Sequence, residues 1–133
     1  MSATPENLQV ESVLSGMQPF QPIAYYDKHL DVIRVQIMDC SITEERFDRI
    51  MTIYHANHHL RPDGMNDIVG FAIKGIRHLL EQLEMKSEGA IMIAELLDKL
   101  VKFYPTMATR RVVEFYLGLG KNAPQSAEMS LAA

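Results

Sequence analysis

The most regular hydrophobic pattern in the sequence lies between residues 23 and 38. After Asp31, β-branched apolar side chains alternate with polar ones, in the order Ile33, Arg34, Val35, Gln36, Ile37. Alternation with a period of two predicts a half-buried strand. Residues 23–26 (IAYY) supply a partner strand, so the whole stretch predicts a β-hairpin. Asp27 and Asp31 bracket its turn, where short carboxylate side chains can accept hydrogen bonds from turn amides.

Residues 41–60 fit two patterns. As a helix they place four apolar side chains on one stripe, with Ser41 and Glu44 as a capping box. As a strand, residues 50–55 contain β-branched and aromatic side chains that suit a pleated surface. The neighbouring hairpin favours the strand. Residues 68–75 predict a further strand, because apolar side chains alternate at Val69, Phe71 and Ile73.

Apolar residues at helical spacing predict three C-terminal helices, over residues 76–85, 88–104 and 106–117. Ser87 and Thr106 are placed to cap the second and third helices. We therefore predict an α+β fold, in which a small antiparallel β-meander over 23–75 is followed by two or three helices packed on it, over 76–120. Residues 1–22 would form an N-terminal arm and 121–133 a flexible tail around this single domain, 23–120. The alternative is a mostly helical protein in which only the 23–38 hairpin is β.

Several of these residues resemble the motifs of a short bacterial β-meander family of unknown function. The likeness covers residues 23–75 and rests on Tyr26-Asp27, on Asp31 before an alternating strand, and on Val69-Gly70 in the closing strand. The family's usual acidic residue in that closing strand is absent, and Ala72 and Lys74 stand there instead. The resemblance implies the β architecture. It implies no activity, because none is assigned to the family.

Composition narrows the class of protein. The chain has 133 residues, of which 47% are hydrophobic and 23% charged, which is typical of one globular domain. A net charge of −4 argues against general nucleic-acid binding, which needs a basic face. Cys40 is the single cysteine, so no internal disulfide can form and a reducing, cytoplasmic location is expected. We expect no signal peptide and no membrane span, the sequence contains no nucleotide-binding glycine motif, and no cofactor is predicted.

The histidines at 55, 58 and 59 are the one cluster of metal-ligand residues that the sequence suggests. On a helix, His55, His58 and His59 would share one face and could meet a zinc ion. On a strand, His58 and His59 point to opposite faces, and His55 lies about 13 Å from His59. The strand prediction therefore argues against the site. A metal-dependent enzyme, or a thiol enzyme in which His55 or His78 activates Cys40, remains an alternative function, and a partly buried unreactive thiol is the simpler interpretation of Cys40.

The C-terminal helices allow two kinds of partner. The start of the 106–116 helix carries Thr106, Thr109, Arg110 and Arg111, which resembles the recognition helix of a helix-turn-helix DNA-binding regulator. The acidic charge argues against that interpretation. In the 88–104 helix a second apolar face is formed by Ile91, Met92, Leu96 and Phe103. Such a face predicts a homodimer or a protein partner, with a deeper core as the alternative. The first functional hypothesis is therefore a non-enzymatic module that self-associates or binds a protein.

Overall fold

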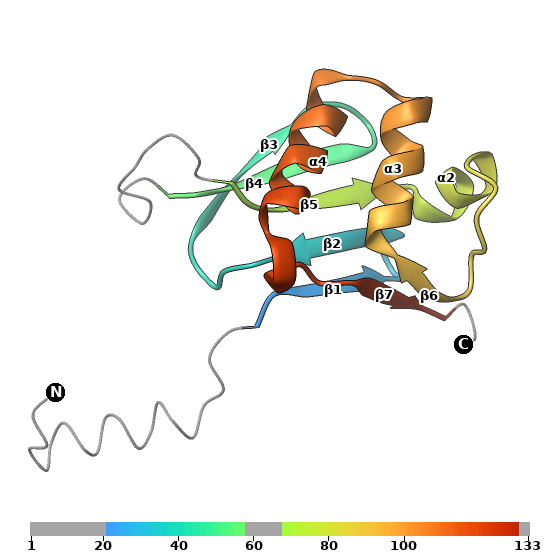
Figure 1. The fold of residues 1–133 in the computed structure, drawn as a ribbon, viewed down its shortest axis with the longest axis horizontal. Coiled ribbons are helices and arrows are strands. Elements are labelled where there is room, and N and C mark those ends of the chain that lie inside the picture. The colour runs from blue at the N-terminus through green and yellow to red at the C-terminus, as the bar shows by residue number, and fades with distance from the viewer. Residues whose placement is uncertain (1–20, 58–67, 131–133) are drawn as a thin grey trace, which may run out of the picture.

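The computed structural model of the chain describes residues 21–57 and 68–130 (Figure 1). The strands within these residues are β1 (Ile23–Asp27), β2 (Val32–Gln36), β3 (Ile42–Arg46), β4 (Met51–Ala56), β5 (Ile68–Lys74), β6 (Gly89–Met92) and β7 (Ser126–Met129). The helices are α2 (Ile76–Gln82), α3 (Ile93–Phe103), α4 (Met107–Gly118) and the short 3₁₀ helix η2 (Gly120–Asn122). The predicted α+β class, an antiparallel β-meander followed by helices, is confirmed.

The five strands β1 to β5 form one antiparallel sheet in the order β1-β2-β5-β4-β3. β1 and β2 make the predicted hairpin, and β3, β4 and β5 follow as a meander that returns so that β5 lies between β2 and β4. Residues 37–41 carry the chain from β2 to the far edge of the sheet. The strands β2 to β5 therefore have Greek-key order, which places β5 between β4, the strand before it in sequence, and the more distant β2.

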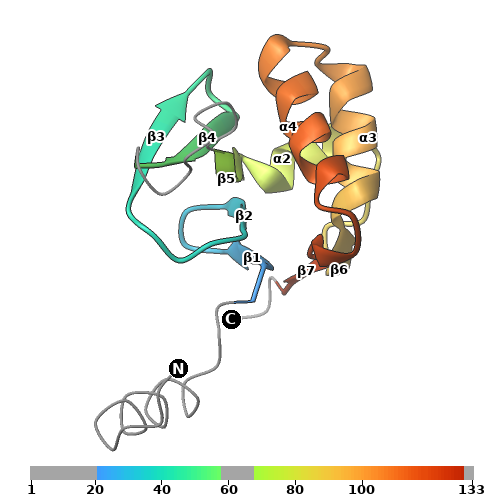
Figure 2. The ribbon, with the colours of Figure 1, turned by 60° about the vertical axis from the view of Figure 1, so that its left-hand side comes forward.

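The helices cover one face of the sheet, as Figures 1 and 2 show from two directions. The apolar residues that alternate along β2, β4 and β5 point to this face, and Phe71 meets Phe115 of α4 edge to face, with ring centroids 6.1 Å apart. The core also includes Ile33, Val35, Met51, Ile53, Ile73, Leu96, Leu100 and Val112. No helix among the described residues is both long and apolar enough to cross a bilayer.

Local hydrogen bonds fix the ends of several elements. The Asp27 carboxylate accepts from the backbone N–H groups of His29 and Leu30, as the turn pattern predicts. Thr106 caps α4 as predicted, and it shares a reciprocal capping box with Thr109. The first turn of α2 is capped from a distance, because the Arg77 N–H donates to the Asp31 carboxylate at 3.2 Å.

Two sequence predictions are wrong in the C-terminal half. Residues 89–92 form β6 in place of the first turn of the predicted 88–104 helix, which begins at Ile93 without Ser87 as its cap. β6 pairs with β7, so the predicted flexible tail is ordered over 121–130, and Ala127 and Met129 are buried. In the 41–60 stretch the favoured strand is confirmed by β4 at 51–56, and the helical alternative is excluded, while the strand β3 at 42–46 was not predicted. The N-terminal arm lies outside the described residues up to residue 20, as do 131–133.

Candidate functional site

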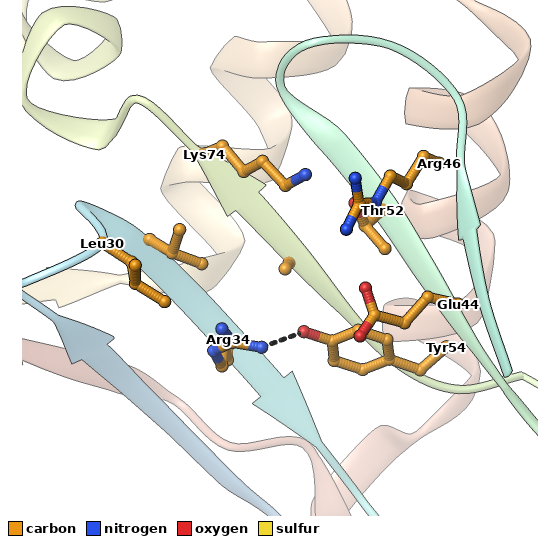
Figure 3. A pocket seen from close by; sticks show the side chains of 9 residues that line it. Leu30, Arg34, Glu44, Arg46, Thr52, Tyr54 and Lys74 are labelled. Atoms are coloured by element: carbon orange, nitrogen blue, oxygen red, sulfur yellow. Dashed lines mark hydrogen bonds between the residues drawn. The ribbon is translucent and has the colours of Figure 1, made fainter. Parts of the chain in front are cut away.

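The residues that the structure describes cover only half of the sheet face that points away from the helices. Figure 2 shows the link between β2 and β3 passing around this side. Apolar residues from the link and its flanks (Ile37, Met38, Cys40 and Ile42) pack against a second cluster formed by Val32, Tyr54, Ala56, Val69 and Ala72. Beside this cover the face stays open, and a pocket of about 330 Å³ remains, bounded by strands β2 to β5 (Figure 3).

The strand register explains why a hollow forms there. Cross-strand pairing places Arg34, Ala72, Thr52 and Arg46 in one row across β2, β5, β4 and β3. The two central members, Ala72 and Thr52, are short, and both are buried. The two outer members are long arginines, whose Cα atoms would lie roughly 14 Å apart across three strand spacings of a flat sheet. A floor of small side chains thus lies between two long ones.

Neighbouring rows complete the wall of the pocket. Lys74 lies two residues beyond Ala72 on β5, and its side chain points into the hollow from one side (Figure 3). On the other side the register pairs Tyr54 with Glu44. The remaining lining residues are Leu30, at the hairpin turn, and Val32.

The pocket carries an excess of positive charge in an acidic protein. Arg34, Arg46 and Lys74 line it against one carboxylate, Glu44, so the local formal charge is +2 while the chain carries −4. Arg34 Nη1 donates to the Tyr54 hydroxyl at 2.5 Å. Within the described residues, Arg46 and Lys74 form no ion pair. Two uncompensated cations that face a semi-enclosed hollow favour an anionic ligand, since field lines concentrate between low-dielectric walls.

Thr52 adds an unusual polar group to the floor. Thr52 is 1% exposed, and its Oγ1 has no hydrogen-bond partner among the described residues. Thr109 is equally buried, yet its hydroxyl donates to the Tyr104 carbonyl at 2.6 Å. A buried polar atom without a partner costs about 1–3 kcal/mol. A ligand acceptor or donor in the pocket would satisfy the Thr52 hydroxyl.

Tyr54 supplies a second hydroxyl. Burial raises the pKa of Tyr54, although the Arg34 guanidinium acts in the opposite direction, so the phenol stays protonated at neutral pH. Its oxygen already accepts from Arg34, which leaves its proton to be donated to a ligand. The ring is seated over Gly70, where an added Cβ would lie 3.1 Å from the ring and 2.3 Å from the Val35 carbonyl oxygen.

The structure describes one of the three histidines that were predicted to bind a metal ion. His55 lies on β4, in the predicted strand, and its Nε2 is 2.7 Å from Glu45 Oε1. His58 and His59 lie outside the described residues. Across 21–57 and 68–130, no three His, Cys, Asp or Glu side chains are grouped closely enough to hold a metal ion. Metal binding by the three histidines stays a prediction.

The other predicted sites are dispersed. Cys40 is half buried, in agreement with a packed thiol, and it packs beside the pocket floor without lining the pocket. Thr106 and Thr109 are engaged in capping α4, while Arg110 and Arg111 are exposed beside them.

The predicted interface on the 88–104 stretch is divided by β6. Ile91 and Leu96 are buried in the core of the chain itself, so they cannot contact a partner, and this part of the prediction is wrong. Ile91 is buried because 89–92 is a strand, which sets its side chains at a different angle from the predicted helix. Leu96 is buried because it lies on the same inward face of α3 as Ile93 and Leu100. Met92 and Phe103 remain exposed, at 44% and 49%.

The pocket residues were missed by the sequence prediction. Arg34, Thr52 and Lys74 alternate with apolar residues on their strands, and this pattern indicates an ordinary solvent-facing side. No family model, curated protein or solved structure matches the chain.

Proposed function

We propose that the protein is a non-enzymatic binding module that holds a small anion in the pocket between β2, β5, β4 and β3. The observation that carries this proposal is the buried Thr52 hydroxyl without a partner, at the floor of a pocket that Arg34, Arg46 and Lys74 surround. A carboxylate or phosphate oxygen would accept from Thr52 and from the cations, in charge-assisted hydrogen bonds. Cys40 is the single cysteine and can form no internal disulfide, which supports a cytoplasmic location for such a module.

The chemistry of the lining favours binding over catalysis. Among the described residues that line the pocket there is no histidine or cysteine, and Glu44 is the single carboxylate. General acid–base catalysis needs a group whose pKa lies near the working pH. The pKa of Tyr54 is shifted upward, away from neutrality. The lining is therefore better suited to hold and orient an anion than to act as a general acid or base.

The volume of the pocket limits the size of the ligand. About 330 Å³ lies at the lower end of the range found for small-molecule sites. Polar and charged side chains form most of its wall, in contrast to the apolar lining of pockets for large hydrophobic ligands. We infer a ligand of few non-hydrogen atoms with one anionic group.

Calorimetric titration with phosphate and with acetate at low ionic strength tests the proposal. We expect saturable binding that weakens as salt is added. Lys74→Gln should weaken it about tenfold, since a hydrogen bond to a charged group contributes about 1.5–3 kcal/mol. Lys121→Gln, at an exposed lysine of η2, is the matched control and should bind as the wild type does. Absence of binding at millimolar anion, or equal affinities in both variants, would overturn the proposal.

Self-association is a second candidate, supported by the two predicted interface residues that stay exposed, Met92 and Phe103. Met107 lies close to Phe103 in sequence and is 68% exposed. Light scattering on a size-exclusion column, at high micromolar concentration, measures the oligomeric state. A dimer that Phe103→Ser dissociates would support this candidate, and a wild-type monomer would contradict it.

A further inference from the structure

The pocket has two chemically different ends. At one end, Lys74 and Arg46 point toward the Thr52 side of the floor (Figure 3). At the other end, Tyr54 and Glu44 face each other across the β3–β4 pair, with Arg34 bonded to the Tyr54 hydroxyl. The cationic end suits the anionic group of a ligand. The Tyr54–Glu44 end suits a different chemical group of the same ligand.

The Tyr54–Glu44 end offers one donor and one acceptor. Tyr54 stays protonated because burial raises its pKa, and its oxygen is already used by Arg34. The Tyr54 hydroxyl can therefore donate a hydrogen bond to a ligand. The Glu44 carboxylate can only accept, and no described residue forms an ion pair or hydrogen bond with it. A group that accepts from Tyr54 and donates to Glu44 satisfies both.

A hydroxyl group meets this requirement, whereas an ammonium group does not. An ammonium has no lone pair to accept the Tyr54 proton, and Arg34 would repel it. A second anionic group would accept from Tyr54 but would be repelled by Glu44. A bare apolar end would leave both polar groups without partners once water is displaced.

We propose that the pocket selects a small hydroxylated anion, in which a carboxylate or phosphate binds at Lys74, Arg46 and Thr52 and a hydroxyl binds between Tyr54 and Glu44. This inference rests on the proposed anion-binding function and names the ligand class for the same pocket. Glu44 acts as the specificity-determining residue, since it rewards a hydroxyl and disfavours a second negative charge.

Matched ligand pairs test the selectivity. We would titrate butyrate against 2-, 3- and 4-hydroxybutyrate, and inorganic phosphate against glycerol phosphate. In the wild type, we expect one hydroxylated isomer to bind about tenfold more tightly than butyrate, because its hydroxyl bonds to a charged carboxylate. The isomers differ in the distance between the two groups, so one should be preferred. The phosphate pair decides which anionic group the pocket takes.

Glu44→Ala should reduce the preference for the hydroxylated ligand to less than twofold. The unsubstituted anion should bind at least as tightly as before, because a repulsive charge has been removed. Glu45→Ala is the matched control: Glu45 is the next residue on β3, is paired with His55 and does not line the pocket. It should keep the full preference.

The outcomes separate the inference from the proposed function. If butyrate and phosphate bind in a Lys74-dependent way without any preference for the hydroxylated forms, the selectivity is wrong and anion binding stands. A preference that survives in Glu44→Ala also overturns the role of Glu44. If neither the simple nor the hydroxylated anions bind, both proposals fall together. A tenfold preference that disappears in Glu44→Ala, and persists in Glu45→Ala, supports the inference.

Discussion

Asp31 shows how one residue joins two elements that are far apart in sequence. Its backbone has a φ of +56°, in the left-handed region that Asp tolerates better than most residues. Its carboxylate accepts from the Tyr26 hydroxyl at 2.7 Å and from the Arg77 N–H at 3.2 Å. A negative charge at the N-terminal turn of α2 also interacts favourably with the helix dipole. Asp31 thus connects the hairpin turn to the first turn of α2.

The titration of Tyr26 reports on this connection. Burial, together with the hydrogen bond to Asp31 and its negative charge, raises the pKa of Tyr26 to about 12. Because the folded state holds this proton above pH 10 while the unfolded state releases it, stability should fall as pH rises from about 10 to about 12. Asp31→Asn removes the charge and should lower the pKa of Tyr26. Carbon NMR of the assigned tyrosine rings measures both values, and an unchanged pKa in the variant would contradict the role of Asp31.

At the scale of single residues, the sequence predicted contacts between residues that are close together in the chain. The bonds from Asp27 to the amides of His29 and Leu30 follow from turn chemistry within three residues. The capping of Arg77 by Asp31 spans 46 residues and depends on the fold. The isolated hydroxyl of Thr52 depends on the strand register, since its neighbours across the sheet are Arg46 and Ala72. No sequence pattern shows that a threonine lacks a partner.

Among the elements, β5 holds the central position, because it pairs with both β2 and β4. Gly70 lies in this strand, opposite Gln36 and Tyr54. Its missing side chain leaves room for the backbone of β2 and for the Tyr54 ring, which forms one wall of the pocket. A side chain at this position would push two paired strands apart.

Gly70→Ala tests this close approach. The new Cβ would lie 2.3 Å from the Val35 carbonyl oxygen, and backbone cannot yield as a flexible side chain can. We expect a loss of about 2 kcal/mol in the free energy of unfolding, in the range for overpacked cores. Gly118→Ala, at the end of α4 with no atom within 4 Å of the added Cβ, is the control and should leave stability nearly unchanged. Equal urea midpoints for the two variants would contradict the account.

The β6–β7 ribbon is the element that the sequence prediction missed. β7 pairs with β6 and lies beside β1 (Figure 1), and Met129 is 1% exposed. Met129→Ala should lower the free energy of unfolding by about 2–5 kcal/mol, as for other large-to-small core changes. Glu128→Ala, at the exposed neighbour, should change it by less than about 0.5 kcal/mol. Thermal or urea unfolding gives both values, and a neutral Met129→Ala would show that the ribbon adds no stability.

Elements with a strong local signal were predicted, and elements that depend on distant partners were not. The strand after Asp31 alternates over five residues, and α4 has its capping threonine and its apolar stripe. β6 and β7 have four residues each, too few for a period to be recognised, and each becomes a strand only by pairing with the other. β3 is an edge strand whose last four residues are all exposed, so its sequence carries no apolar alternation.

For the whole molecule, the two faces of one sheet have different roles. The helices and the face they cover form the core, whose residues the hydrophobic pattern largely identified. The opposite face is covered in part by the link between β2 and β3, and the uncovered part forms the cationic pocket. The charge excess of +2 in the pocket could not be read from an acidic sequence, because β2, β3 and β5 each contribute one cation and strand order brings them together.

Thr52 distinguishes a ligand site from an ordinary solvated face. If a ligand binds here, the buried Thr52 hydroxyl destabilises the ligand-free protein and contributes a hydrogen bond to the complex. Thr52→Val removes the hydroxyl and keeps the shape, so it should stabilise the ligand-free protein by about 1 kcal/mol. Thr109→Val provides the matched control. Thr109 is equally buried, but its hydroxyl donates to the Tyr104 carbonyl and accepts from the Thr106 N–H, so loss of this hydroxyl should destabilise the protein by about 1–3 kcal/mol.

Urea unfolding of the wild type and these two variants, each with and without phosphate, measures both effects in one experiment, since a ligand stabilises the state that binds it. We predict that Thr52→Val is more stable than the wild type without phosphate and gains less stability when phosphate is added. Thr109→Val should be less stable and should gain as much as the wild type. A Thr52→Val variant that is destabilised and gains the full phosphate increment would contradict an anion site at the floor of this pocket.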